Sequence, residues 1–525
     1  MINLAKYTGA KVGVFGLGKT GLGSIKALVV AGATVYAWDD DKNKVYVAKK
    51  IIQDKKVIFS DIIDPFDIKK LDFVIVSPGV PYQFPKPHAI FMYCKKYNIP
   101  IKTDIDLLFE ACPNATYIGV TGTNGKSTTA SLIQYVLTSN KHTSTLGGNI
   151  GISVLSLPHL NEPSANYVLE LSSYQLELLN MSKARKVETL SPLRAYNSRH
   201  GNPSLCKAFS GSPRSLLRSR DDENSELPSR DDEINKFICN DLCYNVKFNI
   251  AILLSITPDH LDRYNSFEEY KSTKIKIFQN QQSTDFGIIS IDVNKDIYPQ
   301  LQKNSLQKII PLSTQVILND GISLIDNKLY DNYFEHGIFT FDLPQSLIGQ
   351  HNAENILATY ATAKILNLNS QKILQTINSF GGLPHRMEII GQAKNITFIN
   401  DSKATNIAAT SKALDCYEDI HWIVGGILKE KEISALGNHL KNVKHCYLVG
   451  RDAKKFISLL EKFNVSYTIS ESIENALIKI KNTVDSGTVL LAPACASFDQ
   501  WKNFEARGNA FKKLVNKYFN TSNTV

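Results

Sequence analysis

The sequence predicts an α/β protein built from three parallel-sheet domains in succession. A short apolar stretch leads directly into a glycine turn and then a helical pattern twice, in residues 11–30 and 117–137. Alternating strands and helices resume after a glycine- and proline-rich junction at 380–390. Such alternation is typical of parallel sheets covered by helices. A chain of 525 residues is long enough for three or four domains.

We place the domain boundaries where this pattern changes. A Rossmann-like domain is expected over residues 1–101, a central parallel-sheet domain over 102–382, and a second Rossmann-like α/β domain over 383–525. Residues 181–245 interrupt the central domain with ten serines, four prolines and a repeated SRDDE. We expect a disordered or loosely folded insertion there, with a partner-binding segment as the alternative.

The stretch YIGVTGTNGKSTT at 117–129 has the features of a phosphate-binding loop. An apolar strand leads into glycines and then into a helix, whose first N–H groups favour anions. Lys126 can reach terminal phosphates, and the Ser127 hydroxyl can ligate Mg²⁺. The strict Walker pattern has glycine where this chain has Val120, so the match is to the shorter GTNGKST core. The sequence therefore predicts a P-loop ATPase-like central domain that binds ATP through Gly122, Thr123, Asn124, Gly125, Lys126, Ser127 and Thr128.

A second glycine turn, GLGKTG, follows the first apolar strand. Gly16, Gly18 and Gly21 match GxGxxG, and Asp39 and Asp40 stand roughly twenty residues further on. The pattern fits a dinucleotide site, but any ligand that carries phosphate could use the same turn. An NAD-dependent oxidoreductase is therefore one alternative, although it leaves the phosphate loop unexplained.

Polar residues follow other predicted strands, at the sheet edge where α/β proteins bind ligands. Ser77 and Gly79 follow one strand, and His260 follows another. Glu170 lies within YVLELSSYQLE, which we predict to be a strand, and an acid beside a phosphate-loop strand is the usual second Mg²⁺ ligand. Lys274 falls in an amphipathic helix, where composition alone predicts a solvated lysine.

Further candidates lie in the last third of the chain. Asn352 and Asn355 stand near the start of a predicted helix, where their amides could face a ligand or could equally cap the helix. In the third domain, polar and aromatic residues follow strand ends on one predicted edge of the sheet, and these are Asp401, Lys403, Thr405, Ser497 and Phe504.

Composition limits the remaining classes. The net charge of +9 is mild, and the basic residues are scattered, so no nucleic-acid partner is implied. Eight cysteines form no CxxC pair, which fits a reducing compartment. No signal peptide and no apolar run of membrane-spanning length is present, so we expect no membrane span. We expect a cytoplasmic monomer.

Taken together, these motifs resemble the Mur ligase family, and within it the members that add D-glutamate. The matching pieces include GLGKTG, SPGVP, GTNGKST, GGNIG, ELSSYQLE, TPDHLDRY, GQHNAEN, GGLPHRME, NDSKATN and LAPACASFDQWKNFEARG. The GTNGKST core also marks folylpolyglutamate ligases, whereas NDSKATN and the last block are more specific. All segments except 181–245 are covered.

The resemblance implies an ATP-dependent, ADP-forming ligase that joins D-glutamate to UDP-N-acetylmuramoyl-L-alanine in peptidoglycan precursor synthesis. The substrate carboxylate would attack the γ-phosphate, and the amine of D-glutamate would then attack the acyl phosphate. Mg²⁺, with two ions expected, and Lys126 would screen the two anions that must meet. Lys274 could supply an anionic metal ligand only if carbamylated by CO₂.

The resemblance also implies roles for residues in all three domains. The catalytic residues would be Lys126, His260 and Lys274, and the metal ligands Ser127, Glu170, His260 and carbamylated Lys274. ATP would also be held by Asn352, Asn355, Arg386 and Asp401. The UDP-substrate would be held by Gly18, Lys19, Thr20, Asp39, Asp40, Ser77, Gly79 and Asn149. D-glutamate would be held by Lys403, Thr405, Lys429, Ser497 and Phe504, although the GGILK turn before Lys429 departs from the family.

Other classes stay open on the sequence alone. Within the ligases, an L-alanine-adding Mur ligase or a folylpolyglutamate-type ligase is the nearest rival. Outside them, a non-catalytic nucleotide-binding scaffold whose insertion recruits partners is the main alternative. ATP turnover that requires both an amino acid and a UDP-sugar would separate these classes.

Overall fold

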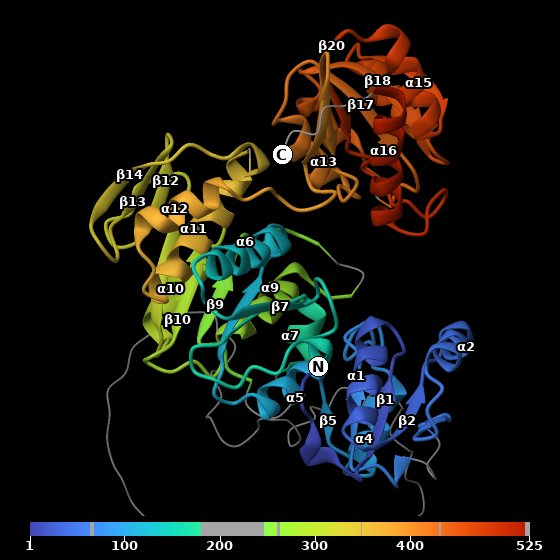
Figure 1. The fold of residues 1–525 in the computed structure, drawn as a ribbon, viewed down its shortest axis with the longest axis vertical. Coiled ribbons are helices and arrows are strands. Elements are labelled where there is room, and N and C mark those ends of the chain that lie inside the picture. Colours follow the sequence, from blue (N-terminus) through green and yellow to red (C-terminus); the bar gives the residue numbers. More distant parts are fainter. Residues whose placement is uncertain (64–67, 180–245, 260–262, 348, 430–431, 520–525) are drawn as a thin grey trace, which may run out of the picture.

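Three α/β bodies follow one another along the chain in the computed structural model (Figure 1). The structure describes residues 1–63, 68–179, 246–259, 263–347, 349–429 and 432–519. The insertion expected at 181–245 lies outside the described residues, and so does His260. Each body contains one sheet, with five, nine and six strands respectively.

The N-terminal sheet has the strand order β3-β2-β1-β4-β5, and all its strands are parallel. This order is the doubly wound arrangement of a Rossmann-like domain, because strands β2 and β3 are added on one side of β1 and strands β4 and β5 on the other. The strands are β1 Lys11–Phe15, β2 Thr34–Trp38, β3 Val57–Phe59, β4 Phe73–Val76 and β5 Ile101–Lys102. The helices are α1 Lys19–Val30, α2 Lys42–Ile51 and α4 Ala89–Lys96.

The central sheet has the order β14-β13-β12-β11-β10-β9-β6-β8-β7. It is parallel from β7 to β12, and β12, β13 and β14 form an antiparallel edge. Its strands are β6 Thr116–Thr121, β7 Ser144–Gly148, β8 Asn166–Glu170, β9 Ile250–Leu253, β10 Phe286–Ser290, β11 Lys308–Ser313, β12 Ile322–Ile325, β13 Lys328–Asp331 and β14 Gly337–Thr340. Its helices are α5 Asp104–Ala111, α6 Lys126–Ser139, α7 Ser173–Leu179, α9 Phe267–Ile275, α10 Ile297–Asn304, α11 Gln350–Ile365 and α12 Ser370–Asn378.

The C-terminal sheet has the order β15-β16-β20-β17-β18-β19, in which only β15 is antiparallel to its neighbour. Its strands are β15 Glu388–Ala393, β16 Asn395–Asn400, β17 Ile420–Gly425, β18 Val443–Val449, β19 Ser466–Glu471 and β20 Ser486–Leu491. Its helices are α13 Ile407–Leu414, α14 Ile457–Lys462, α15 Ile473–Thr483 and α16 Phe504–Phe519. The predicted three-domain α/β fold class is confirmed.

The strand predicted through YVLELSSYQLE is wrong in its second half. Strand β8 ends at Glu170, and helix α7 begins at Ser173. The Ser172 hydroxyl accepts a hydrogen bond from the Gln175 N–H at 3.2 Å, while the Gln175 side chain accepts from the Ser172 N–H at 3.0 Å. This reciprocal capping starts a helix within an apolar stretch that reads as strand by composition.

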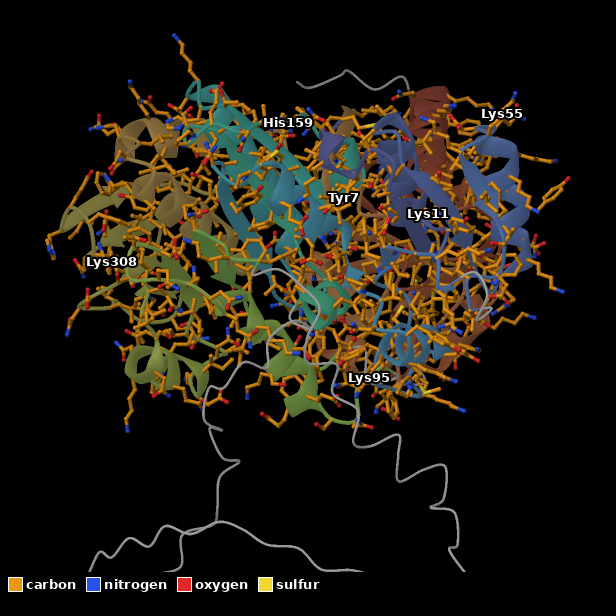
Figure 2. The ribbon with its side chains drawn as sticks, turned by 90° about the horizontal axis from the view of Figure 1, so that it is seen from below. Tyr7, Lys11, Lys55, Lys95, His159 and Lys308 are labelled. Atoms are coloured by element: carbon orange, nitrogen blue, oxygen red, sulfur yellow. The ribbon has the colours of Figure 1, made fainter. Side chains whose placement is uncertain are left out.

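Exposed lysines are spread over the surface rather than gathered. Lys11, Lys55, Lys95 and Lys308 are exposed and lie on different parts of the protein (Figure 2). In the described part of the chain, no helix is long and apolar enough to cross a membrane.

Two buried carboxyl groups start helix α5, which connects the first two sheets. Burial raises the pKa of Asp104 to about 6 and that of Asp106 to about 7. One oxygen of each group is buried and has no hydrogen-bond partner among the residues that the structure describes. The second oxygen of Asp106 accepts from the Thr103 N–H at 2.6 Å, so the side chain is held in place.

Stability is expected to fall as the pH rises from 5 to 8. Because the folded pKa values lie above the ordinary aspartate value, the folded state binds more protons than the unfolded state until about pH 7. Each pKa unit corresponds to about 1.4 kcal/mol, so a loss of about 1–3 kcal/mol is expected from Asp106. Urea unfolding of wild type and Asp106→Asn at pH 5 and pH 8 checks this. Parallel pH dependence in the two proteins would contradict it.

Candidate active site

The phosphate loop joins strand β6 to helix α6 through two glycines in conformations that other residues rarely adopt. Gly122 has φ +153° and Gly125 has φ +81°. A Cβ atom at Gly125 would stand 2.4 Å from the Asn355 side-chain oxygen, and one at Gly122 would stand 2.7 Å from Leu254. Both the turn and its close neighbours therefore require glycine at these positions.

Lys126 folds back onto the loop that carries it. Its ammonium group donates to the carbonyl oxygens of Gly122 at 3.0 Å and Thr123 at 2.7 Å. Burial lowers the pKa of Lys126, and the nearby Glu170 carboxylate acts in the opposite direction. The loop thus holds a cation at the helix N-terminus, where the backbone already favours anions.

Glu170 lies at the end of β8 and is almost completely buried. Its side chain is 2% exposed, one oxygen accepts from the Asn149 amide at 3.0 Å, and the other has no partner in the described part of the chain. A solvated glutamate is therefore ruled out. A buried carboxylate oxygen without a partner fits a hard cation such as Mg²⁺, and Ser127 lies in the first turn of helix α6, directly after the loop.

Lys274 is buried, contrary to the surface position that composition alone predicts. The residue is 2% exposed, and its ammonium group donates to the Gly122 carbonyl at 2.7 Å and lies 4.7 Å from the centre of the Tyr270 ring. Burial lowers its pKa well below the ordinary value, and the nearby Lys126 lowers it further. Helix α9 therefore brings a second lysine to the phosphate loop.

A cavity of about 330 Å³ opens beside the loop, between the central and C-terminal sheets. Asn352 and Asn355 line it from helix α11, whose N-cap is Gly349, so neither asparagine caps the helix. The Asn355 amide donates to the Asn352 side-chain oxygen at 2.8 Å, and its own oxygen accepts from the Thr129 hydroxyl at 2.9 Å. Arg386, Asp401 and Lys403 line the other wall.

Arg386 connects the C-terminal domain to the phosphate loop. Its guanidinium group donates to the Ser127 hydroxyl at 3.0 Å. Burial raises the pKa of Asp401 to about 7, and the Arg386 charge opposes this rise. Asp401 accepts a hydrogen bond from the Met387 N–H at 3.3 Å, which fixes the turn that carries Arg386.

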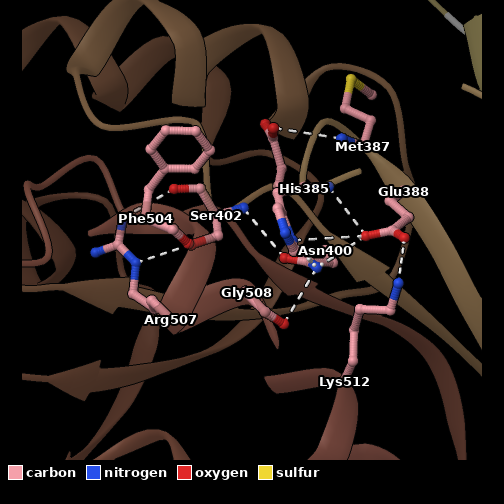
Figure 3. A network of polar contacts seen from close by, with 10 residues as sticks. His385, Met387, Glu388, Asn400, Ser402, Phe504, Arg507, Gly508 and Lys512 are labelled. Atoms are coloured by element: carbon pink, nitrogen blue, oxygen red, sulfur yellow. Dashed lines mark hydrogen bonds and ion pairs between the residues drawn. The ribbon is translucent and has the colours of Figure 1, made fainter. Parts of the chain in front are cut away.

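A polar network anchors this turn to the C-terminal sheet (Figure 3). Glu388 accepts from the His385 N–H at 2.9 Å and from the Asn400 amide at 3.0 Å, and it pairs with Lys512 of helix α16. The Asn400 amide also contacts the His385 ring at 2.9 Å. These contacts fix the turn that carries Arg386, whose side chain reaches the phosphate loop.

The residues expected to hold D-glutamate are partly brought together. Lys403 lies 3.9 Å from the centre of the Phe504 ring, and Ser497 is buried. Thr405 follows on the same turn after β16. Of the five expected residues, Lys403 alone lines one of the two described cavities, and Thr405, Lys429, Ser497 and Phe504 line neither. Lys429 is also exposed.

Arg507 connects the chain segments that carry Ser402, Cys495 and Phe504. It is 3% exposed and donates to the Ser402 hydroxyl at 2.9 Å, the Ser402 carbonyl at 2.8 Å and the Cys495 carbonyl at 3.1 Å. The Ser402 hydroxyl in turn donates to the Phe504 carbonyl at 2.9 Å (Figure 3). One guanidinium group thus fixes three chain segments relative to one another.

Arg507→Lys is expected to lower stability by about 2 kcal/mol, because an ammonium cannot reproduce three bonds from a planar fork. The KM for the amino-acid substrate should also rise more than the KM for ATP. Thermal unfolding and steady-state kinetics check this, with the exposed Arg451→Lys as the matched control. Equal stability of the two variants would contradict the assignment.

A second cavity, of about 430 Å³, lies at the ends of the N-terminal strands. It is lined by the residues expected around the UDP-substrate, namely Gly18, Lys19, Thr20, Asp39, Asp40, Ser77, Gly79 and Asn149. Asp39 accepts from the Leu17 N–H at 2.7 Å, so it also stabilises the glycine turn. The Lys19 ammonium donates to the Gly151 carbonyl and links this turn to the central domain.

Sequence reasoning missed several residues of the two cavities. His88, which lies 2.9 Å from Asp40, lines the substrate cavity, as do Tyr174 and Gln175. Tyr174 and Gln175 lie in the stretch assigned to a strand, and recognition of the Ser172–Gln175 capping box could have found them. Glu354 lines the cavity beside the phosphate loop and belongs to the quoted GQHNAEN motif.

The central domain carries the phosphate loop, a buried carboxylate and one wall of a cavity that the C-terminal domain completes, and a second cavity lies at the strand ends of the N-terminal domain. This arrangement fits an enzyme that uses a nucleoside triphosphate. Three family models match the chain. They are "Mur ligase MurD-like, N-terminal domain" over residues 10–92, "Mur ligase middle domain" over 236–363 and "Mur ligase, glutamate ligase domain" over 385–495. The chain belongs to the Mur ligase family.

Curated relatives match along almost the whole chain. A UDP-N-acetylmuramoylalanine–D-glutamate ligase of Wolbachia sp. subsp. Brugia malayi is 37% identical, with 98% of each chain covered. One of Rickettsia prowazekii is 35% identical, with 98% of this chain and 99% of the relative covered. Among solved structures, a UDP-N-acetylmuramate-alanine ligase from Thermotoga maritima has a TM-score of 0.54 at 17% identity, covering 97% of this chain and 99% of its own, which supports the fold.

Proposed function

We propose that this enzyme joins D-glutamate to UDP-N-acetylmuramoyl-L-alanine and converts ATP to ADP and phosphate. The observation that carries the proposal is the Arg386–Ser127 hydrogen bond, which brings the phosphate loop and the C-terminal domain to one cavity. The choice of D-glutamate is supported by the name shared by relatives at 32–37% identity over nearly the full chain.

The reaction begins with two anions, the substrate carboxylate and the γ-phosphate. Lys126 leaves the loop carbonyls to neutralise the transferring phosphoryl group, and Arg386 adds a second positive charge beside Ser127. The carboxylate oxygen attacks phosphorus, and ADP leaves. The amine of D-glutamate then attacks the acyl phosphate, and phosphate departs from the tetrahedral intermediate.

Ser127 and Glu170 would hold one Mg²⁺, which lowers the repulsion between the two anions when bound. The partnerless oxygen of Glu170 supports this assignment. We propose a second ion near Lys274, held by His260 and by a carbamate on the Lys274 nitrogen. Carbamate formation needs a neutral amine, and the lowered pKa of buried Lys274 favours that form.

The other site assignments follow the same scheme. Asn352, Asn355 and Asp401 would hold the nucleotide, and the second cavity would hold the UDP-sugar. Lys403, Thr405, Ser497 and Phe504 would hold D-glutamate, with Lys429 able to join them only if its exposed segment moves. We propose the same domain boundaries, between residues 101 and 102, which form strand β5, and between residues 382 and 383.

We further propose a monomer that acts in the cytoplasm. Among the described residues, Cys112, Cys446 and Cys495 are free thiols. Free thiols fit a reducing compartment, where ATP is also available.

Phosphate release tests the proposal. With ATP, Mg²⁺ and UDP-N-acetylmuramoyl-L-alanine, release should require D-glutamate and be at least tenfold slower with L-glutamate or L-alanine. If L-alanine and UDP-N-acetylmuramate gave phosphate release as fast as D-glutamate and UDP-N-acetylmuramoyl-L-alanine, the enzyme would be an L-alanine-adding ligase instead. Hydrolysis that needs no amino acid would overturn the ligase assignment.

A further inference from the structure

Arg263 crosses from the central domain to the wall of the UDP-substrate cavity. It lies between strand β9 and helix α9, and its Nη1 donates to the Gly79 carbonyl of the N-terminal domain at 3.2 Å. The guanidinium carbon also lies 4.5 Å from the centre of the Tyr174 ring. Gly79 and Tyr174 both line the cavity, so Arg263 braces two of its walls from behind.

A row of aromatic rings continues from Arg263 to the phosphate loop. Tyr174 and Tyr264 stack with ring centroids 6.4 Å apart and planes 15° apart, and Tyr264 meets Tyr270 edge-on at 5.3 Å. The Tyr270 hydroxyl lies 3.2 Å from the Thr123 hydroxyl, and Lys274 lies 4.7 Å from the Tyr270 ring. A displacement of one packed ring displaces its neighbours, because protein cores are dense and their side chains occupy fixed rotamers.

The hydrogen bonding of Arg263 is incomplete, although the residue is only partly exposed. Its Nε and Nη2 are buried and have no hydrogen-bond partner within the described ranges. Unsatisfied buried donors destabilise a fold, so stability does not account for an arginine at this position. A role in holding the two domains in register does account for it, since the contact to Gly79 and the stacking on Tyr174 together require a planar, charged group.

We propose that Arg263 is a positioning residue that sets the UDP-substrate cavity at a fixed place relative to Lys274 and the phosphate loop. This inference rests on the proposed function, because it assumes that the cavity holds the UDP-sugar. Its consequence is that the substrate carboxylate reaches the γ-phosphate only while the Gly79 turn and the Tyr174 ring are braced.

Steady-state kinetics of Arg263→Gln and Arg263→Lys test the proposal. The glutamine variant should raise the KM for the UDP-substrate about tenfold, the effect of losing a charge-assisted hydrogen bond and a stacked cation, and should lower kcat. The KM for ATP should change less than twofold, because the nucleotide cavity is built by other residues. The lysine variant should recover only part of the loss, since an ammonium has no planar fork. Tyr174→Leu, which removes the stacked ring, should likewise raise the KM for the UDP-substrate more than the KM for ATP.

The exposed Arg451→Gln is the matched control and should behave as wild type. Thermal unfolding of each variant separates a positioning defect from a folding defect. Equal rises in both KM values, or an unchanged KM for the UDP-substrate in a folded Arg263→Gln, would overturn the inference. A wild-type protein that releases no phosphate with D-glutamate would overturn the proposed function instead, so the two failures are distinct.

Discussion

Lys126→Ala is expected to lose ligation while keeping its fold. The substitution removes the ammonium group that neutralises the transferring phosphoryl group, and the loss of one such preorganised contact raises the barrier by about 3 kcal/mol or more. That corresponds to at least about a 150-fold lower kcat. The fold should persist because strand β6, the two glycines and helix α6 remain. Phosphate release and circular dichroism measure the two quantities.

Lys481→Ala is the matched control for this substitution, because Lys481 lies exposed near the end of helix α15, far along the chain from the loop. It should turn over at the wild-type rate. Near-normal turnover in a folded Lys126→Ala protein would contradict the assignment of the ATP site to the phosphate loop.

Lys274→Ala should be nearly inactive and should still bind ATP. If the Lys274 nitrogen carries a carbamate, the substitution deletes an oxygen ligand of the kind that Mg²⁺ prefers. Lys274→Arg should not restore activity, because a guanidinium group stays cationic and cannot take up CO₂. Acetate added to Lys274→Ala could occupy the vacated space as a carboxylate and restore part of the rate.

The arginine variant decides between two roles for this lysine. Full activity in Lys274→Arg would rule out the carbamate and leave an ordinary cation at this position. Activity restored to Lys274→Ala by acetate, but not by a matched concentration of chloride, would support an anionic ligand. Equilibrium binding of ATP to both variants shows that the nucleotide cavity is intact.

The phosphate loop could be predicted from sequence because its requirements are local. Two glycines, a lysine and a serine act within a few residues of one another, and the strand before them is apolar. The Rossmann-like character of the N-terminal domain followed from the same kind of local signal, the GLGKTG turn after an apolar strand.

The burial of Lys274 could not be predicted locally, because it depends on where helix α9 packs. The helix surface reads as mixed, and only contact with Gly122, 152 residues earlier, shows that the lysine faces inward. Arg507 is similar, since its three acceptors belong to Ser402 and Cys495. The position of Lys429 could not be predicted from the sequence either. Its distance from the site depends on the conformation of the GGILK turn, which departs from the family pattern.

The Gly122 carbonyl accepts from both Lys126 and Lys274. An oxygen with two lone pairs is thereby fully occupied, and the Lys126 ammonium group has already exchanged water for protein oxygens during folding. An arriving phosphate exchanges one oxygen partner of Lys126 for another, with little further dehydration of the cation. Much of the solvation cost of bringing the Lys126 charge to a triphosphate is therefore met before the nucleotide arrives.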